Sequence, residues 1–290
     1  RVLESFNRGG SEGYSFDLKG MKEAISSSLA NDFDYIGIAC SLIVFLFLWF
    51  SLGSIELALI SFIPMAVSWI WILGIMAILG VKFNVVNVIL ATFIFGQGDD
   101  YTIFMTEGCQ WEYAYRKKMI ASYKNGITIS ALIMFIGIGS LVFARHPALH
   151  SLAEVTIIGM LSVVLMAYLI PPLIFRWLVT KKGEYRVRPL SLSMLMPCKK
   201  ESYNYYVRFV KDRYRYKGQE VFSSVKKSLR RNSNYSNFIL DKDTLEELQD
   251  KIVVLNNGRG EFSLLLALYH PNKEIFAFEG DEQLVALATY

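Results

Sequence analysis

Cysteine and histidine are scarce in this chain, with three of each among 290 residues. The cysteines, Cys40, Cys109 and Cys198, lie far apart, without the spacing of a disulfide framework or a metal-binding motif. We therefore expect no metal centre and no disulfide. Charged residues are also few, at 19%, whereas 53% of the residues are hydrophobic. So apolar a composition is unusual for a soluble domain and indicates a membrane protein.

The hydrophobic residues are concentrated in long blocks between residues 35 and 180. A helix rises about 1.5 Å per residue and the hydrocarbon core is about 30 Å thick, so roughly 20 apolar residues can cross it. Five segments are of this kind: Tyr35–Gly53, Leu57–Gly80, Phe83–Met105, Gly126–Ala144 and Leu152–Val179. The sequence thus predicts an α-helical polytopic membrane bundle of about five transmembrane helices over residues 35–180.

The segments that flank and connect this bundle are polar. Residues 1–34 are typical of the end of an extracytoplasmic domain followed by a helix that leads into the bilayer. The chain begins at Arg1 and its first residues do not form a signal peptide, so we expect it to be a piece of a longer protein. Residues 107–125 are polar, aromatic and basic, and we expect a helix there that lies on the membrane surface.

Positive charges gather on one side of the predicted bundle. Eight of them lie in the loop after the third segment or just after the fifth: Arg116, Lys117, Lys118, Lys124, Lys181, Lys182, Arg186 and Arg188. The short loops on the opposite side offer only Lys82 and Arg145. The positive-inside rule then places the C-terminus in the cytoplasm and residues 1–34 outside it.

The stretch that follows the bundle is strongly basic. Residues 176–231 carry 16 Lys or Arg against four acids, with tyrosines interleaved. Such a composition can indicate nucleic-acid binding, but directly beside a membrane segment it more often indicates anionic lipid headgroups. We expect residues 181–240 to be a basic juxtamembrane linker held near the membrane, with no nucleic-acid partner. From residue 241 the balance reverses to ten acids against four bases, which indicates a domain boundary.

Two adjacent carboxylates interrupt the third apolar segment, within the stretch "GQGDDYTIFMTEG". Each Asp near a helix centre costs roughly 2.5–3.5 kcal/mol to insert, so the pair nearly cancels the gain from the apolar residues of its own segment. This helix is therefore expected inside a bundle, where Gly96 and Gly98 allow another helix to approach closely. Burial favours the protonated form of a carboxyl group, so Asp99 or Asp100 can exchange protons near neutral pH.

These residues predict a proton relay made of Asp99, Asp100 and Tyr101. We expect Asp100 to carry the proton, Tyr101 to orient it through its hydroxyl, and Asp99 to modulate its proton affinity. The alternative is a structural polar clamp between helices, although ionisable residues inside a membrane are functional by default. No residue of the chain is assigned a catalytic or metal-binding role.

Taken with the later stretch "NGITISALIMFIGIGSLVFARHPALHSLAEVTIIGM", these motifs resemble the C-terminal membrane half of the resistance-nodulation-division (RND) superfamily, in particular its MMPL-type lipid exporters. The resemblance covers roughly residues 20–180. It implies a multi-pass transporter of the bacterial inner (plasma) membrane that exports a lipid-like or amphiphilic cargo, is driven by the proton gradient and needs no cofactor for transport. Asp100 and Tyr101 fall on the family's relay positions. The implied partners are membrane lipids and a first six-helix half of the transporter.

The last 50 residues, 241–290, have a different pattern. The stretch "KIVVLNNGRGEFSLLLALYHPNKEIFAFEGDEQLVALA" predicts strand, glycine turn, helix, strand and helix, a small and incomplete α/β Rossmann-like piece. It resembles the first unit of a class I S-adenosylmethionine-dependent methyltransferase. That resemblance implies S-adenosylmethionine as cofactor, bound at Gly258 and Gly260 and through its ribose at Glu279. A dinucleotide-binding Rossmann unit is the alternative.

This C-terminal piece departs from the methyltransferase pattern in several ways. Asn256 stands where an Asp is usual, Phe262 where a third Gly is usual, and the chain holds two strands of an expected seven. We therefore expect a truncated, methyltransferase-like unit that does not methylate anything by itself. The whole arrangement resembles composite proteins that join an MMPL transporter, an acyltransferase and a methyltransferase.

Three functions remain open from the sequence. The first is proton-coupled export of an amphiphilic molecule by a partial MMPL-type transporter. The second is a membrane-anchored methyltransferase fragment, for which the transmembrane part is only an anchor. The third is an inactive fragment. The buried acids discriminate between the first two, because an anchor needs no carboxylates inside the membrane.

Overall fold

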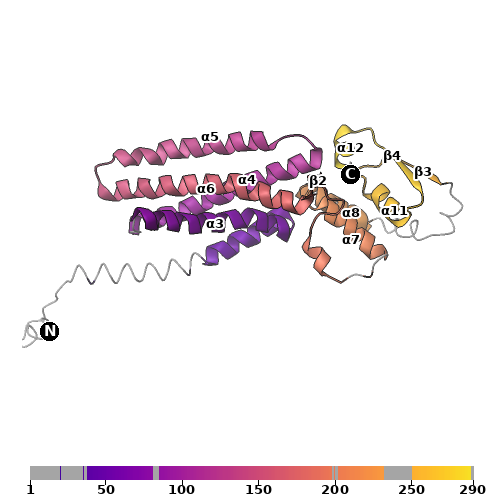
Figure 1. The fold of residues 1–290 in the computed structure, drawn as a ribbon, viewed down its shortest axis with the longest axis horizontal. Helices are drawn as coiled ribbons and strands as arrows, with labels where there is room; N and C mark the ends of the chain where they lie inside the picture. Colours follow the sequence, from indigo (N-terminus) through magenta and orange to yellow (C-terminus); the bar gives the residue numbers. More distant parts are fainter. Residues whose placement is uncertain are drawn as a thin grey trace, which may run out of the picture.

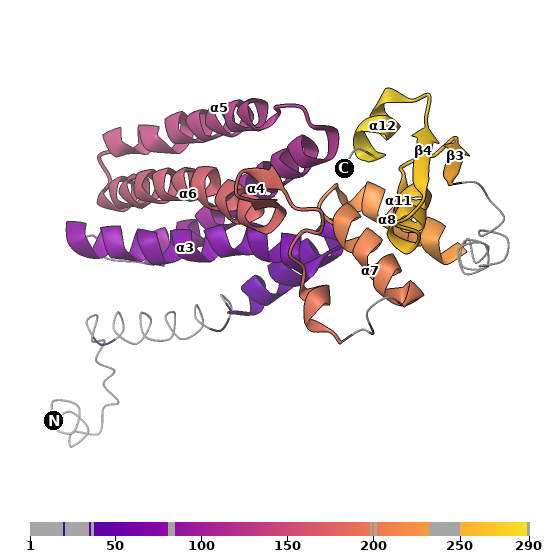
Figure 2. The same cartoon turned by 45° about the vertical axis from the view of Figure 1, so that its right-hand side comes forward.

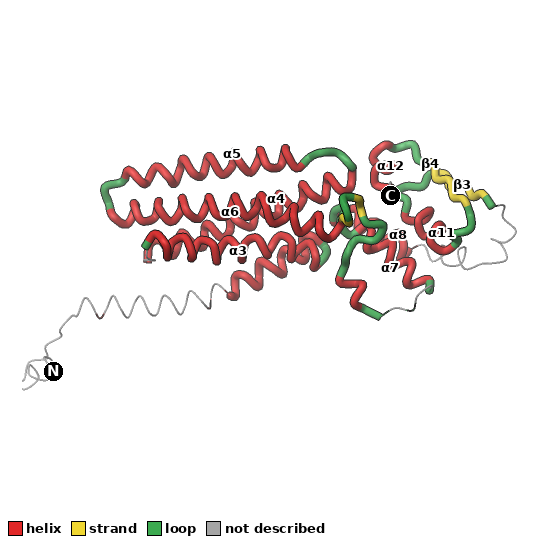
Figure 3. Tube along the Cα trace, in the orientation of Figure 1, coloured by secondary structure: helices red, strands yellow, loops and turns green. Residues whose placement is uncertain are grey.

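The structure of the chain is a computed structural model that describes residues 20, 35, 38–80, 85–197, 199, 202–231 and 250–288. The predictions for residues 1–34, apart from Gly20, and for parts of 181–240 and 241–290 lie outside the described residues. Within the described part, helices account for most of the chain, and strands occur only in two small sheets (Figure 3).

Four long helices form a bundle of nearly parallel rods: α3 (Ile55–Leu79), α4 (Val85–Tyr115), α5 (Ile120–Gly139) and α6 (Pro147–Val179) (Figure 1). The 3₁₀ turn η2 (Ser140–Phe143) extends α5, and a shorter apolar helix, Ile38–Leu52, precedes α3. Helices α4 and α6 pack against each other, and each also packs against α3 and α5. Figure 2 shows the same rods from a second direction.

Among the described residues, three helical segments are long and apolar enough to cross a membrane: Ile55–Leu79, Ile120–Phe143 and Leu149–Val179. They coincide with the second, fourth and fifth segments expected from the sequence, and they confirm a membrane protein. The first and third segments correspond to Ile38–Leu52, which is shorter, and to α4, whose carboxylates lower its apolar character. The count of five transmembrane helices stays a prediction.

The expectation of a surface helix over residues 107–125 is wrong. Helix α4 continues through this region to Tyr115, and α5 already begins at Ile120, so only four residues connect them. The reason is packing: Cys109 and Tyr113 are buried among residues of α3 and α6, while Ala114 is buried against the helices that follow the bundle. These tertiary contacts extend α4 beyond the apolar run that predicted it.

The segment after α6 is folded onto one end of the bundle. It begins with a hairpin of two short strands, β1 (Thr180–Lys181) and β2 (Glu184–Tyr185), and a 3₁₀ turn, η3 (Leu192–Leu195). Two helices follow, α7 (Tyr203–Tyr214) and α8 (Gln219–Arg231). Part of the expected linker is therefore helical and packed.

The C-terminal unit is a parallel β–α–β arrangement followed by a helix. Its elements are β3 (Lys251–Leu255), α11 (Glu261–Tyr269), β4 (Glu274–Phe278) and α12 (Glu282–Ala288). Strands β3 and β4 pair in parallel, with Lys251 opposite Glu274 and Leu255 opposite Phe278. Leucines of α11 and α12 share one hydrophobic core with α7, α8 and Ala114 of α4. Packing thus crosses the boundary that charge composition places at residue 241.

A buried ionic network joins the described residues from 180 to 288, called the soluble part below, to the bundle. Asp212, fully buried at the end of α7, accepts from Arg188 at 2.6 Å and from Ser193 at 2.6 Å. Arg215 donates to Asp212 at 3.4 Å and to Glu56, in the first turn of α3, at 2.9 Å. Glu56 and Arg215 are 159 residues apart in sequence, so the network fixes the α7–α8 pair to the end of a candidate transmembrane helix.

Candidate functional site

A stripe of polar side chains runs along the buried face of α4. Its members follow one another at spacings of three or four residues and are at most 8% exposed: Asp99, Thr102, Thr106 and Gln110. Thr102 donates to the backbone oxygen of Asp99 at 2.9 Å, and Thr106 donates to that of Thr102 at 2.8 Å. The Ser61 hydroxyl of α3 donates to Thr106 at 3.0 Å, so this polar stripe lies against α3.

The two neighbouring carboxylates lie on different faces of α4. Asp99 is 8% exposed, and its Oδ1 has no hydrogen-bond partner in the part of the chain that the structure describes. Asp100 is exposed, as is Gly96 one turn before it. A carboxylate withdrawn from water without a partner is costly when charged, whereas a protonated carboxyl group is tolerated there. Asp99 therefore has the surroundings that the sequence analysis expected for Asp100.

Tyr101, the third predicted relay residue, is turned toward α5. It is 4% exposed, and its hydroxyl oxygen lies 3.5 Å from Ser130 Oγ. Among the described residues, no hydrogen bond joins this hydroxyl to Asp99 or Asp100. The structure therefore places the three predicted residues on one helical turn but directs them to three different surroundings.

Glycines allow α4 and α6 to approach closely beside Asp99. A methyl group on Gly159 of α6 would lie 2.6 Å from Ile94 Cδ1, and one on Gly98 of α4 would lie 3.4 Å from Val163. The first distance is well below van der Waals contact, so a side chain at Gly159 would force the helices apart. The tight packing limits access of lipid and water to this side of Asp99.

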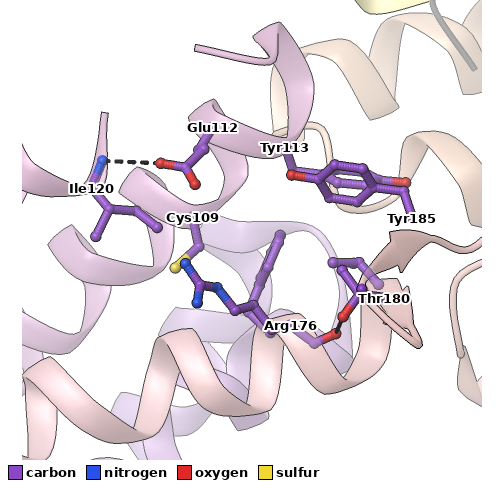
Figure 4. Close-up of a pocket in the computed structure, with 10 residues that line it drawn as sticks. Cys109, Glu112, Tyr113, Ile120, Arg176, Thr180 and Tyr185 are labelled. Carbon is purple, nitrogen blue, oxygen red and sulfur yellow. Dashed lines mark hydrogen bonds between the residues drawn. The ribbon is translucent and has the colours of Figure 1, made fainter. Parts of the chain in front are cut away.

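At the end of the bundle next to the soluble part, the described residues enclose a hollow of about 300 Å³ (Figure 4). Its lining includes Cys109, Glu112 and Tyr113 of α4, Arg176 of α6 and Tyr185 of β2. The Glu112 carboxylate accepts from the backbone N–H of Met119 at 3.3 Å and of Ile120 at 3.4 Å. This hollow, lined by both polar and apolar side chains, lies where α4, α5 and α6 meet the β1–β2 hairpin.

No prediction from the sequence covers this hollow. Gln110 and Tyr113 continue the spacing that starts at Asp99, and Tyr113 lines the hollow, so the polar stripe of α4 ends there. A signal was present, because polar residues recur at helical spacing from Asp99 to Gln110. It was missed because residues 107–125 were interpreted as a surface segment rather than as a continuation of the helix.

In the C-terminal unit, the structure brings together the residues predicted to bind S-adenosylmethionine. Asn256, Gly258 and Gly260 all have positive φ, at 51°, 60° and 83°, so the turn after β3 is tight. The Glu279 carboxylate accepts from the Gly258 N–H at 2.7 Å and from the Gly280 N–H at 2.9 Å. The hydrogen bond from the Gly258 N–H is the main reason why the pKa of Glu279 lies below its usual value.

These contacts lie within the C-terminal unit, and S-adenosylmethionine binding there stays a prediction. A ribose would need the Glu279 oxygens as acceptors, and the cofactor would need access to the backbone of the glycine turn. Here the carboxylate and the Gly258 N–H are bound to each other. Gly258 and Glu279 therefore act within the structure as a clamp between the β3–α11 turn and the end of β4.

Comparison with known proteins assigns the membrane part of the chain. The family model described as MMPL family matches residues 19–184, more than half of the 290 residues. No curated protein and no solved structure matches the chain. The match includes the four bundle helices, with the polar stripe of α4 and the hollow at its end, and it indicates a transporter-type function. The chain belongs to the MMPL family.

Proposed function

We propose that this chain forms part of a proton-coupled exporter of a lipid-like or amphiphilic molecule, in which Asp99 holds the coupling proton. The observation that carries this proposal is the burial of Asp99 with an unpartnered Oδ1 inside a bundle that belongs to the MMPL family. A proton that crosses the membrane potential releases about 2.3 kcal/mol per 100 mV. Protonation of Asp99 changes which packing of α3, α4 and α6 is preferred, and this couples the proton to a conformational change.

We infer that the polar stripe of α4 leads from Asp99 toward water at the hollow, on one side of the membrane. Thr102, Thr106 and Gln110 lead along α4 from Asp99 to the hollow lined by Tyr113 and Glu112. Hydroxyl and amide groups in such a row can pass a proton when water joins them. We therefore assign the hollow as the proton port on the side of the soluble part.

Asp100 and Tyr101 have supporting roles in this proposal. Asp100 lies on the open face of α4 with Gly96, where the first six-helix half expected from the family resemblance would pack. Tyr101 holds α4 to α5 through Ser130. Asp100 thus modulates the proton affinity of Asp99 across one peptide unit, which exchanges the roles that the sequence analysis gave to the two acids.

The same proposal places the soluble part in the cytoplasm of a bacterium, with the bundle in the inner membrane. Arg116, Lys117 and Lys118 connect α4 to α5 at the end of the bundle where Lys181 and Lys182 follow α6, and the soluble part is attached there. The positive-inside rule favours the cytoplasm for this end. The C-terminal β–α–β unit then acts as a cytoplasmic domain seated on the bundle, not as a methyltransferase.

Proton coupling is testable in the full-length transporter reconstituted into vesicles that contain a pH-sensitive dye. Asp99→Asn keeps the size of the side chain and removes its titration, so we expect proton movement down an imposed gradient to fall at least tenfold. Asp100→Asn, the matched control on the neighbouring residue, should reduce it less than threefold. Loss of proton movement in Asp100→Asn with normal movement in Asp99→Asn would contradict the assignment.

A further inference from the structure

The hollow beside the β1–β2 hairpin has hydrogen-bond donors that lack acceptors. Tyr113, which is 2% exposed, and Tyr185 both line it, and neither hydroxyl has a hydrogen-bond partner among the described residues. Arg176 lines it too, and its guanidinium makes no hydrogen bond or ion pair within the part of the chain that the structure describes. A buried donor without an acceptor is costly, so these side chains favour a ligand that brings acceptor atoms.

The acid that lines the hollow, Glu112, is already in use. Its Oε2 accepts from the backbone N–H groups of Met119 at 3.3 Å and of Ile120 at 3.4 Å. Figure 4 shows this carboxylate turned toward Ile120 and away from Tyr185. Glu112 therefore holds the connection between α4 and α5, and it forms no ion pair with Arg176.

Two further cations lie close to the tyrosine rings of the hollow. The guanidinium carbon of Arg116 is 3.8 Å from the Tyr185 ring centre and 5.2 Å from that of Tyr113. Its Nη1 is buried, with no hydrogen-bond partner in the described ranges. Burial raises the pKa of Tyr113, and the charges of Arg213 and Arg116 oppose that rise. The Tyr113 hydroxyl thus stays protonated at neutral pH and remains a donor, in surroundings of positive charge.

These donors select the chemical class of the ligand. A guanidinium can bind two oxygens of an anion at once, and each tyrosine hydroxyl binds one more. A phosphate group has enough acceptor oxygens for all three side chains, whereas the two oxygens of a carboxylate would be occupied by the guanidinium alone. The hollow of about 300 Å³ is at the lower end of the range of roughly 300–1,000 Å³ for ligand sites, so it suits a small molecule.

The position of the hollow favours a ligand from the aqueous phase. Thr180 and Gly183 of the β1–β2 hairpin form part of its lining, beyond the end of α6 at Val179. Arg176 is in the last turn of α6 and is exposed. The hollow is therefore at the end of the bundle, on the side of the soluble part.

We propose that this hollow binds the phosphate group of a small water-soluble compound, with Arg176 as the charged ligand and the hydroxyls of Tyr113 and Tyr185 as further donors. The bound phosphate joins α4, α6 and the β1–β2 hairpin. Its binding does not require proton movement through Asp99, so a failure of the transport proposal would leave this site intact.

The test uses the complete chain in a neutral detergent, with inorganic phosphate as the probe and the width of its phosphorus NMR signal as the readout, at constant ionic strength. We expect saturable binding of one phosphate per chain. Arg176→Gln removes the charged donors and should weaken the affinity at least tenfold. Tyr113→Phe keeps the ring, removes one hydroxyl and should weaken it at least threefold.

The matched control is Lys181→Gln. It makes the same change of charge at an exposed residue of β1 that does not line the hollow, and it should leave the affinity unchanged. Circular dichroism of each variant verifies that the helices remain folded. Equal affinities of Arg176→Gln and Lys181→Gln would show general attraction between charges and would overturn the site, as would the lack of saturable binding in the unchanged chain.

Competing ligands test the chemical class and the source of the phosphate. Acetate should displace the bound phosphate far less well than sulfate, and equal displacement by the two would overturn the preference for a phosphate group. Glycerol phosphate and a short-chain phosphatidic acid should compete with similar strength. Displacement by the phosphatidic acid at a hundredfold lower concentration would assign the site to a lipid headgroup and would overturn the proposal of a water-soluble ligand.

Discussion

Two buried carboxylates, Asp99 in the middle of the bundle and Asp212 at its end, have opposite surroundings. Asp212 is fully buried and accepts hydrogen bonds from Arg188, Ser193 and Arg215. Asp99 is nearly as buried, but its Oδ1 has no partner in the described part of the chain. A buried charge with all its partners is typical of a structural role, whereas a buried acid without partners is typical of a group that changes its protonation.

The largest effect should come from breaking the paired site. Asp212→Asn leaves Arg188 without its counter-charge in a buried network, and removing one partner of a buried ion pair costs about 3–5 kcal/mol. We expect a loss near the lower figure, because Arg188 is 16% exposed and keeps some contact with water. Pulse proteolysis of the soluble part measures this loss.

The control for this experiment is Asp99→Asn in the same assay. It should change the proteolysis of the soluble part very little, because Asp99 makes no ion pair with described residues. If Asp99→Asn destabilised the protein as much as Asp212→Asn, the distinction between a paired structural acid and an unpartnered functional one would fail.

The tight packing beside Asp99 should give the next largest effect. Gly159→Ala places a methyl group 2.6 Å from Ile94 Cδ1, and such overpacking typically costs about 1–3 kcal/mol. Gly137→Ala in α5 is the matched control, since nothing lies within 4 Å of the added atom. Thermal unfolding in detergent, followed by circular dichroism, should show a lower midpoint temperature for Gly159→Ala alone. Equal midpoint temperatures for the two variants would argue against the close approach of α4 and α6.

A third effect concerns Lys217, which joins the α7–α8 pair to the C-terminal unit. It is 3% exposed, donates to the backbone oxygen of Leu287, and lies 4.9 Å from the Tyr214 ring centre. Burial first, and then the charges of Arg213 and Arg116, lower the pKa of Lys217 from 10.5 to about 7. Folding therefore releases a proton between these two pH values.

The sign of the pH dependence follows from that shift. Above pH 10.5 the amine is neutral in both states, and between pH 10.5 and 7 the unfolded state binds the extra proton. Stability should therefore rise as the pH is raised from 7 toward 10, by at most about 1.4 kcal/mol per pH unit. The protection of the α12 amides from hydrogen exchange measures this change in stability. Lys217→Met should flatten this rise in stability. An unchanged pH profile in that variant would show that other groups cause the rise.

The sequence predicted the apolar helices well, because a long hydrophobic run is long enough for a membrane-spanning helix and is seldom found in any other structure. Segments 57–80 and 152–179 correspond closely to α3 and α6. It did not predict the end of α4 at Tyr115, since residues 107–115 are polar and their helical state depends on burial against α6 and the soluble part. The same limit applies to Glu56 and Arg215, whose pairing over 159 positions no local pattern indicates.

The candidate site was only partly predictable for a related reason. The composition of the third segment predicted a functional carboxylate there, and Asp99, Asp100 and Tyr101 lie on one turn of α4, but their role as a proton relay stays a prediction. Which acid is buried depends on the rotation of α4 against α3 and α6, and neighbouring helical positions differ by about 100°. The packing of Gly98 on Val163 and of Ile94 on Gly159, together with the Ser61–Thr106 hydrogen bond, fixes that rotation.

The measurement that tests the central claim most directly is labelling with dicyclohexylcarbodiimide, an apolar reagent that reacts with protonated carboxyl groups inside membranes. With the complete chain in vesicles at neutral pH, we expect one adduct on the peptide that contains Asp99 and Asp100. The adduct should persist in Asp100→Asn and disappear in Asp99→Asn. Labelling that disappears in Asp100→Asn and persists in Asp99→Asn would contradict the assignment of the proton to Asp99.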